Sequence, residues 1–115
     1  MHELAIAEYL LGSVTDFAQQ IGARKVLAIN LVLGERSGVV DDSLRFSFDL
    51  LAAGTLAENA QLNARRVPMR FGCAACDAEY QPSGDDFACP RCGTVGQVVD
   101  DASQLIIESI EIEDE

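Results

Sequence analysis

The sequence contains no tryptophan, only one histidine, and only 8 lysine and arginine residues against 19 aspartate and glutamate residues, for a formal net charge of -11. Such an acidic surface repels phosphate backbones, which argues against nucleic-acid binding and favours a cationic metal or a basic protein surface as partner. Because the single histidine, His2, is at the terminus of the chain, we expect that no Ser/His or Cys/His pair for nucleophilic catalysis can be assembled from it. A glycine-rich phosphate loop is also missing, so we expect no enzyme.

Long apolar runs are missing too. No stretch approaches the roughly 20 residues that span a bilayer, and the start of the chain lacks the basic segment and apolar core of a secretory signal. We therefore expect a cytoplasmic protein with no membrane segment, whose four cysteines face a reducing compartment and bind metal rather than form disulfides. At 115 residues, the chain is expected to be a single folding unit or one small domain with a satellite module.

Hydrophobic periodicity predicts two helices. The first covers residues 2–21. Its apolar residues form one stripe, made of Leu10, Val14, Phe17 and Ile21, with Leu4, Ala7, Leu11 and Ala18 beside it. The second helix is expected to start at a cap formed by Asp42 or Ser43 and to end at Gly54.

Three strands are expected besides the helices. They cover about Val26–Leu33, part of residues 60–71, and about Gln104–Ile112. Pro68 weakens the second of them or places it at a sheet edge, because proline cannot donate a ladder hydrogen bond. In the third, the hydrophobic pattern changes phase near Ile106 and Ile107, which indicates a β-bulge.

A block of different composition, roughly residues 72–93, separates the last two strands and holds all four cysteines. The expected fold is therefore α+β: a small domain of two helices and a three-stranded sheet, with an inserted zinc-ribbon-like module. We assign residues 1–70 plus 94–115 to the α/β domain and residues 71–93 to an inserted four-cysteine zinc-binding domain. The natural hinge candidates are Val67–Gly72 and Gly93–Asp101.

The cysteines form two C-x2-C pairs, CAAC and CPRC, separated by twelve residues. The pairs are Cys73 with Cys76 and Cys89 with Cys92. Each pair fits a tight turn that directs two sulfurs toward one point, and four thiolates in tetrahedral geometry suit Zn²⁺. A site without an open coordination position is structural rather than catalytic. Tetrathiolate iron is a chemical alternative, and a redox dithiol is disfavoured because no thioredoxin-like βαβ unit surrounds the pairs.

The first residues of the chain, MHE, offer a second set of metal ligands. The amine of Met1, the amide nitrogen of His2 and the His2 imidazole Nδ1 can close a five-membered and a six-membered chelate ring around one ion. Glu3 can supply a fourth donor from its amide or carboxylate. Planar, nitrogen-rich coordination of this kind favours Ni²⁺ or Cu²⁺ over Zn²⁺.

Several segments occur in one order along almost the whole chain: MHE, LVLGERSGV, SLRFSFDLL and GTLAENAQL, followed by the two C-x2-C pairs. Together they closely resemble the HypA/HybF family of hydrogenase nickel-incorporation proteins. The resemblance implies a nickel metallochaperone that delivers Ni²⁺ to the large subunit of [NiFe]-hydrogenase, together with the HypB GTPase. In some organisms the family also serves urease maturation.

The resemblance also implies which residues bind each metal. Nickel, the transported cargo, maps onto His2, with Glu3 and Met1 contributing, so the α/β domain would be the nickel-binding one. Structural zinc maps onto Cys73, Cys76, Cys89 and Cys92. Some members of the family recruit a further histidine from near the zinc module, and this sequence has none there. The last nickel position would then be filled by Glu3, water or a partner.

Other functional classes remain as alternatives to the metallochaperone. One is a zinc-stabilised protein–protein adaptor that binds no second metal. Another is a zinc-ribbon nucleic-acid module, which the net charge of -11 disfavours. A homodimer is compatible with the sequence.

Overall fold

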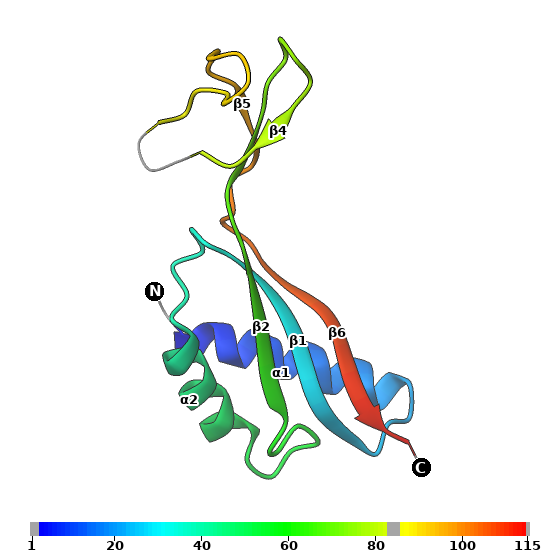
Figure 1. Ribbon diagram of the computed structural model, residues 1–115. Helices are drawn as coiled ribbons and strands as arrows, with labels where there is room; N and C mark the ends of the chain where they lie inside the picture. Colours follow the sequence, from blue (N-terminus) through cyan, green and yellow to red (C-terminus); the bar gives the residue numbers. More distant parts are fainter. Residues whose placement is uncertain (1–2, 83–85, 115) are drawn as a thin grey trace.

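The computed structural model describes residues 3–82 and 86–114. Two helices and six strands follow one another along this part of the chain (Figure 1). They are α1 (Glu3–Gln20), β1 (Lys25–Gly34), α2 (Asp41–Ala52), β2 (Gln61–Val67), β3 (Arg70–Gly72), β4 (Glu79–Tyr80), β5 (Gln97–Asp100) and β6 (Leu105–Glu113). The strands form two three-stranded sheets, ordered β2-β1-β6 and β4-β3-β5. The predicted α+β class, with two helices and a three-stranded sheet beside a cysteine module, is confirmed.

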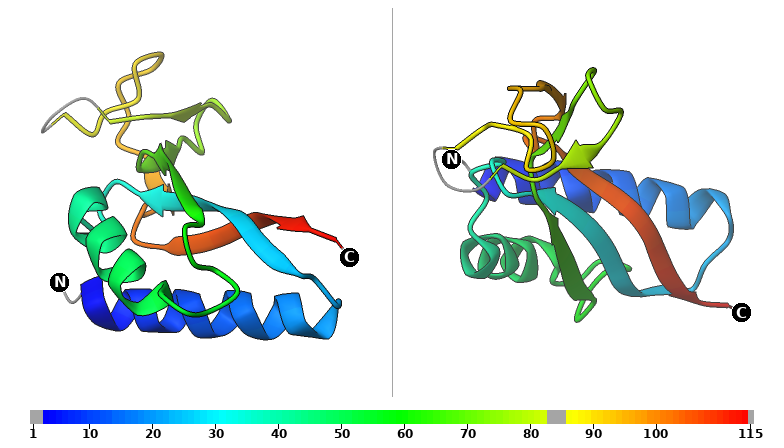
Figure 2. Two further views of the ribbon diagram at one scale, coloured as in Figure 1. Left: turned by 90° about the horizontal axis from the view of Figure 1, so that it is seen from below. Right: turned by 45° about the horizontal axis from the view of Figure 1, so that its top comes forward.

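The first sheet is built around β1, which pairs in parallel with β2 and antiparallel with β6. Both helices cover the same face of this sheet (Figure 2). Alternate residues of β1, Ile29, Leu31 and Leu33, point to that face and are fully buried. Together with apolar residues of both helices they form one continuous hydrophobic core.

The stripe predicted for α1 is half right. Leu10 and Val14 are buried, whereas Phe17 and Ile21 are 51% and 49% exposed. Besides Leu10 and Val14, the buried residues of the helix are Ala7 and Ala18, which the sequence places beside the predicted stripe. Alanine at these two positions lets the helix lie close to its neighbours.

The second helix starts slightly before the predicted cap. Val40 occupies the N-cap position without a side-chain cap hydrogen bond, so the prediction that Asp42 or Ser43 caps the helix is wrong. The backbone N–H of Val40 itself donates to a residue far away in the sequence, Oε2 of Glu3, at 3.1 Å. The predicted end is right: the helix stops at Ala52, and Gly54 follows with φ +81°.

The bulge predicted in the last strand is confirmed one residue further on. Asn30 pairs with Ser109 while Leu31 pairs with Ile107, so Glu108 is the extra residue. Pro68 has the expected effect as well, because β2 is an edge strand that stops at Val67.

Polar side chains connect the strands on the open face of the first sheet. The side-chain amide of Asn30 donates to Oγ of Ser109 at 3.0 Å and to a carboxylate oxygen of Glu111 at 3.3 Å. The amide of Asn63 donates in turn to Oδ1 of Asn30 at 3.0 Å. These bonds join all three strands on the side that the helices leave uncovered.

The second sheet lies at one end of a molecule that measures 55 × 27 × 16 Å (Figure 1). Residues 97–100, which fall in a predicted hinge, form β5 and pair with β3. The predicted division into two domains, residues 1–70 plus 94–115 and residues 71–93, stays a prediction. The strand pairing places residues 97–100 in the same sheet as β3 and β4, beside the cysteines.

The two sheets meet where the backbone of Ala102 crosses that of Gly34. The N–H of Gly34 donates to the carbonyl of Gln104, and the N–H of Arg36 donates to that of Ala102, both at 2.8 Å. A Cβ at Gly34 would lie 2.0 Å from the carbonyl oxygen of Ala102, so only glycine allows this approach. Neither helix, within residues 3–82 and 86–114, is long and apolar enough to cross a membrane.

Candidate metal centre

Two turns of the same design present the cysteines. In the first, the N–H of Cys73 donates to the carbonyl of Ala78 at 2.8 Å, and the N–H of Asp77 donates to that of Cys73 at 2.7 Å. The second repeats both bonds at 2.8 Å, with Cys89, Gly93 and Thr94 in the corresponding positions. The fifth residue of each turn has a left-handed backbone, with φ +58° at Asp77 and φ +78° at Gly93.

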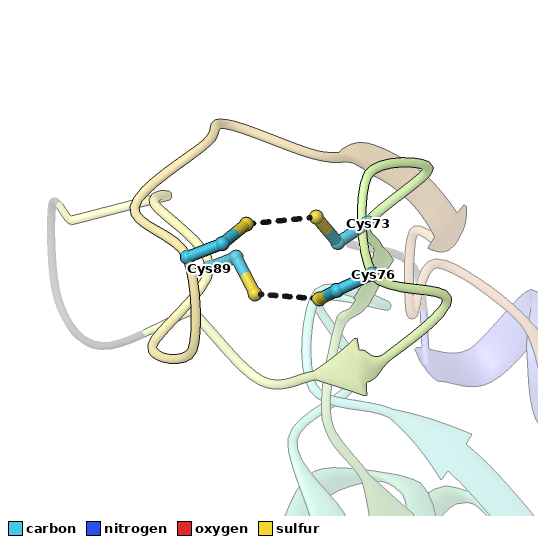
Figure 3. Close-up of side chains that lie close together, drawn as sticks. Cys73, Cys76 and Cys89 are labelled. Carbon is cyan, nitrogen blue, oxygen red and sulfur yellow. Dashed lines mark hydrogen bonds between the residues drawn. The ribbon is translucent and has the colours of Figure 1, made fainter.

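The turns face each other and bring all four sulfurs together (Figure 3). The Sγ atoms of Cys73 and Cys92 are 3.4 Å apart, and those of Cys76 and Cys89 are 3.6 Å apart. All four lie within 4.8 Å of one another, and all are free thiols. A tetrahedral ion with metal–sulfur bonds of about 2.3 Å needs sulfurs about 3.8 Å apart, so the donor set fits Zn²⁺.

A small aromatic core supports these turns. The ring of Phe71 packs against those of Tyr80 and Phe87, at centroid distances of 5.8 Å and 5.5 Å. The hydroxyl of Tyr80 donates to the carbonyl of Phe87 at 2.6 Å and accepts from the N–H of Gly96 at 3.0 Å. One hydroxyl therefore ties β4 to the segments on both sides of the second cysteine turn.

The thiols of the cluster differ strongly in acidity. Hydrogen bonds from the hydroxyl and backbone N–H of Thr94, with a further one from Cys73, lower the pKa of Cys92 from 9.0 to about 6. The backbone N–H of Ala78 lowers the pKa of Cys76, but its hydrogen bond with Cys89 and burial outweigh this and raise the pKa to about 11. Cys92 therefore loses its proton more readily than Cys76, and a thiolate is the form that binds a cation.

The predicted nickel ligands Met1 and His2 lie outside the described residues. Glu3 begins α1, away from the cysteine cluster and against the start of α2, where its carboxylate binds the N–H of Val40. Glu3 and Asp42 both line a surface cavity of about 510 Å³ between the two helices. A carboxylate from α2 thus lies beside the chain's first helical turn, a neighbour that the sequence analysis did not identify.

A third element holds the same corner of the molecule. Nη2 of Arg66, near the end of β2, donates to the carbonyl of Val39 at 2.5 Å and to Oδ1 of Asp41 at 2.6 Å. The turn before α2 is therefore fixed between Glu3 of α1 and Arg66 of β2. No local pattern reveals such a contact, since Glu3 and Val40 are 37 positions apart.

A helix-covered sheet with a four-cysteine cluster that could hold a metal ion defines the class of small α+β proteins with a candidate metal centre. The comparisons make the class specific. Residues 1–112 match the family model described as HypA, hydrogenase/urease nickel incorporation, metallochaperone. The chain belongs to this HypA family.

Relatives and solved structures agree with this assignment. The hydrogenase maturation factor HypA of Dehalococcoides mccartyi is 40% identical over 115 residues, covering 100% of this chain and 97% of the relative. That of Geobacter metallireducens is 37% identical over 114 residues, covering 98% and 100%. The solution structure of the Ni metallochaperone HypA from Helicobacter pylori matches over 100% of both chains with a TM-score of 0.67 at 19% identity. A second HypA solution structure has a TM-score of 0.75. At this identity the two structures support the fold alone.

Proposed function

We propose that this chain binds Ni²⁺ at its amino-terminal end and delivers it to the large subunit of [NiFe]-hydrogenase during maturation. The observation that carries the proposal is the family match over residues 1–112, in a chain that begins with MHE and holds a four-cysteine cluster. Nickel is the cargo, so its site must both load the ion and give it up.

The ligand set is proposed from chemistry. The amine of Met1, the amide of His2 and the imidazole Nδ1 of His2 supply three nitrogens in one plane, and Glu3 supplies a fourth donor. A chelate at the end of a helix can be dismantled one ligand at a time, which suits transfer. The position of Glu3 beside Asp42 supports the proposal, because the carboxylates attract a divalent cation to this corner.

The cysteine cluster is proposed to hold Zn²⁺ as a structural ion. A sheet of strands with two to four residues has little core of its own, and thiolate–zinc bonds can stabilise it instead. The four sulfurs saturate a tetrahedral ion and leave no position for a substrate. The module is therefore expected to supply a rigid surface rather than chemistry.

The remaining parts of the proposal concern partners and location. We propose the HypB GTPase as the partner in delivery and the cytoplasm as the compartment, with urease maturation components as further recipients. The role is one of delivery and not of catalysis. The family description, which names hydrogenase and urease nickel incorporation and a metallochaperone, supports the delivery role and the urease recipients.

Nickel titration of the untagged, zinc-loaded protein tests the nickel site. We expect His2→Ala to abolish specific nickel binding and Glu3→Gln to weaken it, while the zinc content stays at one ion per chain as in the native protein. Glu113→Gln, which removes one carboxylate at the far end of β6, is the matched control and should bind nickel normally. Residues added ahead of Met1 should also impair binding, because the amine becomes an amide. Unchanged nickel affinity in His2→Ala would refute the site.

Zinc is tested separately. Cys73→Ala should lose zinc on dialysis, because three thiolates hold the ion less tightly than four. Retention of zinc by that variant would contradict the four-thiolate site. A native protein that binds zinc but gives no heat or spectral change with nickel would instead be a zinc-stabilised adaptor.

A further inference from the structure

The outer side of the helix pair is hollowed along its length. Two cavities follow one another between α1 and α2. The first, of about 510 Å³, is lined by Glu3, Leu4, Asp42, Ser43, Phe46 and Ser47. The second, of about 780 Å³, is lined by Glu8, Leu11, Gly12, Thr15, Gln19, Leu51, Gly54, Thr55 and Leu56. We call the surface that these residues form, together with Leu50, the α1–α2 groove.

Large apolar side chains project from the groove into solvent. Phe46 is 70% exposed, Leu50 is 65% exposed and Leu4 is 50% exposed. Phe46 and Leu50 are four positions apart on α2 and therefore lie on one side of that helix. Leu11 and Leu51 lie deeper, where they pack against the hydrophobic core. This combination of an apolar floor and protruding apolar anchors is typical of a surface that a partner covers.

A glycine keeps the middle of the groove open. Gly12 is in the interior of α1, where glycine costs about 1 kcal/mol relative to alanine. Nothing in the molecule requires it, because a Cβ built at Gly12 meets no atom of the described residues within 4 Å. The hydroxyl of Thr15, one turn later, points back to the carbonyl of Leu11 at 2.7 Å. The centre of the α1 wall is therefore flat, which allows a second backbone to approach closely.

The negative charge of the α1–α2 groove favours a basic partner. Glu3, Glu8 and Asp42 line it, and none of the described residues that line the two cavities is lysine or arginine. A second copy of this chain, with its net charge of -11, would be repelled. The part of α1 from Leu4 to Thr15 is about 17 Å long, which matches about three turns of a partner helix.

We propose that the α1–α2 groove is a docking site for a basic amphipathic helix of a partner protein. The apolar face of that helix covers Phe46 and Leu50, and its lysine or arginine side chains face the groove carboxylates. The proposal goes beyond nickel binding and does not depend on it. It assigns the recognition surface to the helices and leaves the cysteine module outside the contact.

A model peptide tests the surface in zinc-loaded, nickel-free protein. The probe is a fluorescein-labelled leucine–lysine amphipathic helix of about 18 residues, titrated by fluorescence anisotropy at about 0.15 M salt. A scrambled peptide of the same composition and a leucine–glutamate helix are the peptide controls, and both should bind much more weakly. Chemical-shift mapping should place the perturbed amides on α1 and α2.

Protein variants localise the contact. The double variant Phe46→Ala, Leu50→Ala should bind the probe roughly tenfold or more weakly, because both apolar anchors are lost. Gly12→Leu, which fills the groove and strengthens the helix, should weaken binding similarly and covers the case in which the double variant is unstable. The matched control changes two equally exposed apolar residues of the cysteine module, Val95→Ala with Val98→Ala, and should bind as the native protein does.

Two results would overturn the proposal. One is a groove variant that is folded and binds the probe with native affinity, or a control pair that weakens it as much as the groove variants do. The other is a native protein that dimerises in sedimentation experiments and becomes monomeric in the Phe46→Ala, Leu50→Ala variant, which would assign the groove to a second copy. The nickel titration is a separate measurement, so the two proposals can fail independently.

Discussion

The close approach of Gly34 to Ala102 predicts a large loss of stability in Gly34→Ala. The added Cβ would lie 2.0 Å from the carbonyl oxygen and 2.2 Å from the carbonyl carbon of Ala102. Because both are backbone atoms, no rotamer change relieves the clash, and the crossing segment must retreat by about 1.4 Å to reach ordinary contact. The turn that crosses Gly34 is the connection between β5 and β6, so the strain falls on the junction of the two sheets.

The size of the effect follows from the bonds at that crossing. The hydrogen bonds Gly34 N–H to Gln104 and Arg36 N–H to Ala102, both 2.8 Å long, would be lost or stretched. Each contributes about 1 kcal/mol, and overpacking at a buried contact adds about 1–3 kcal/mol. We therefore expect the free energy of unfolding to fall by about 3–5 kcal/mol.

Urea denaturation with excess zinc, followed by far-ultraviolet circular dichroism, measures this change. Gly12→Ala is the matched control, because the same atom is added in open space within a helix, and it should raise the free energy of unfolding by about 0.5–1 kcal/mol. The reasoning is wrong if Gly34→Ala unfolds within about 0.5 kcal/mol of the native protein, or if both variants are destabilised alike.

Three further predictions concern the module and the corner near Glu3. Tyr80→Phe keeps the ring but removes two hydrogen bonds, so zinc should be lost more readily to a competing chelator; native retention would show that the hydroxyl does not support the turns. In zinc-free protein at pH 7, iodoacetamide should modify Cys92 first and Cys76 last, because their pKa values are about 6 and about 11. The rate of modification at Cys92 should fall as the pH drops below about 6, where this thiol becomes protonated, and equal rates at Cys92 and Cys76 at pH 7, measured by peptide mass spectrometry, would contradict the preference. Arg66→Gln should lower the free energy of unfolding by about 1 kcal/mol and speed amide exchange in the first turn of α2, because its bonds to Val39 and Asp41 are lost. The control is Arg65→Gln, because the ion pair of Arg65 with Glu108 is more exposed. It should change the free energy of unfolding and the amide exchange much less, and equal effects of the two variants would contradict the role of Arg66.

The features that could be predicted from the sequence are those that short-range spacing determines. The C-x2-C spacing fixes two tight turns whatever surrounds them, and the structure brings the four sulfurs together as expected. The change of phase near Ile106 and Ile107 predicts the bulge at Glu108 because side chains alternate strictly along a strand. Gly54 marks the end of α2 for a similar local reason.

The features that the sequence analysis missed depend on distant contacts. The helical period of α1 is compatible with more than one apolar stripe through Leu10 and Val14. Only packing against the sheet decides that Ala18 is buried and that Phe17 stays exposed to solvent. At the start of α2, the backbone N–H of Val40 donates to a carboxylate that comes from Glu3, 37 positions away. Residues 97–100 fall in the predicted hinge Gly93–Asp101 but form β5, and local composition does not reveal this because the pairing partner, β3, is remote in sequence. The assignment of His2 stays a prediction, since it lies outside the described residues.

The hydrogen bonds of the Asn30 side chain on the open face of the first sheet have a consequence for how this chain can change during evolution. One central amide, that of Asn30, touches a residue of each neighbouring strand, so both neighbours are aligned to the same point. Strand alignment is then specified within the strands themselves and not by the lengths of the connections between them. Insertions or deletions in the segments that join β1 to β2, or that carry the cysteine module, can accordingly accumulate without shifting the strands against each other.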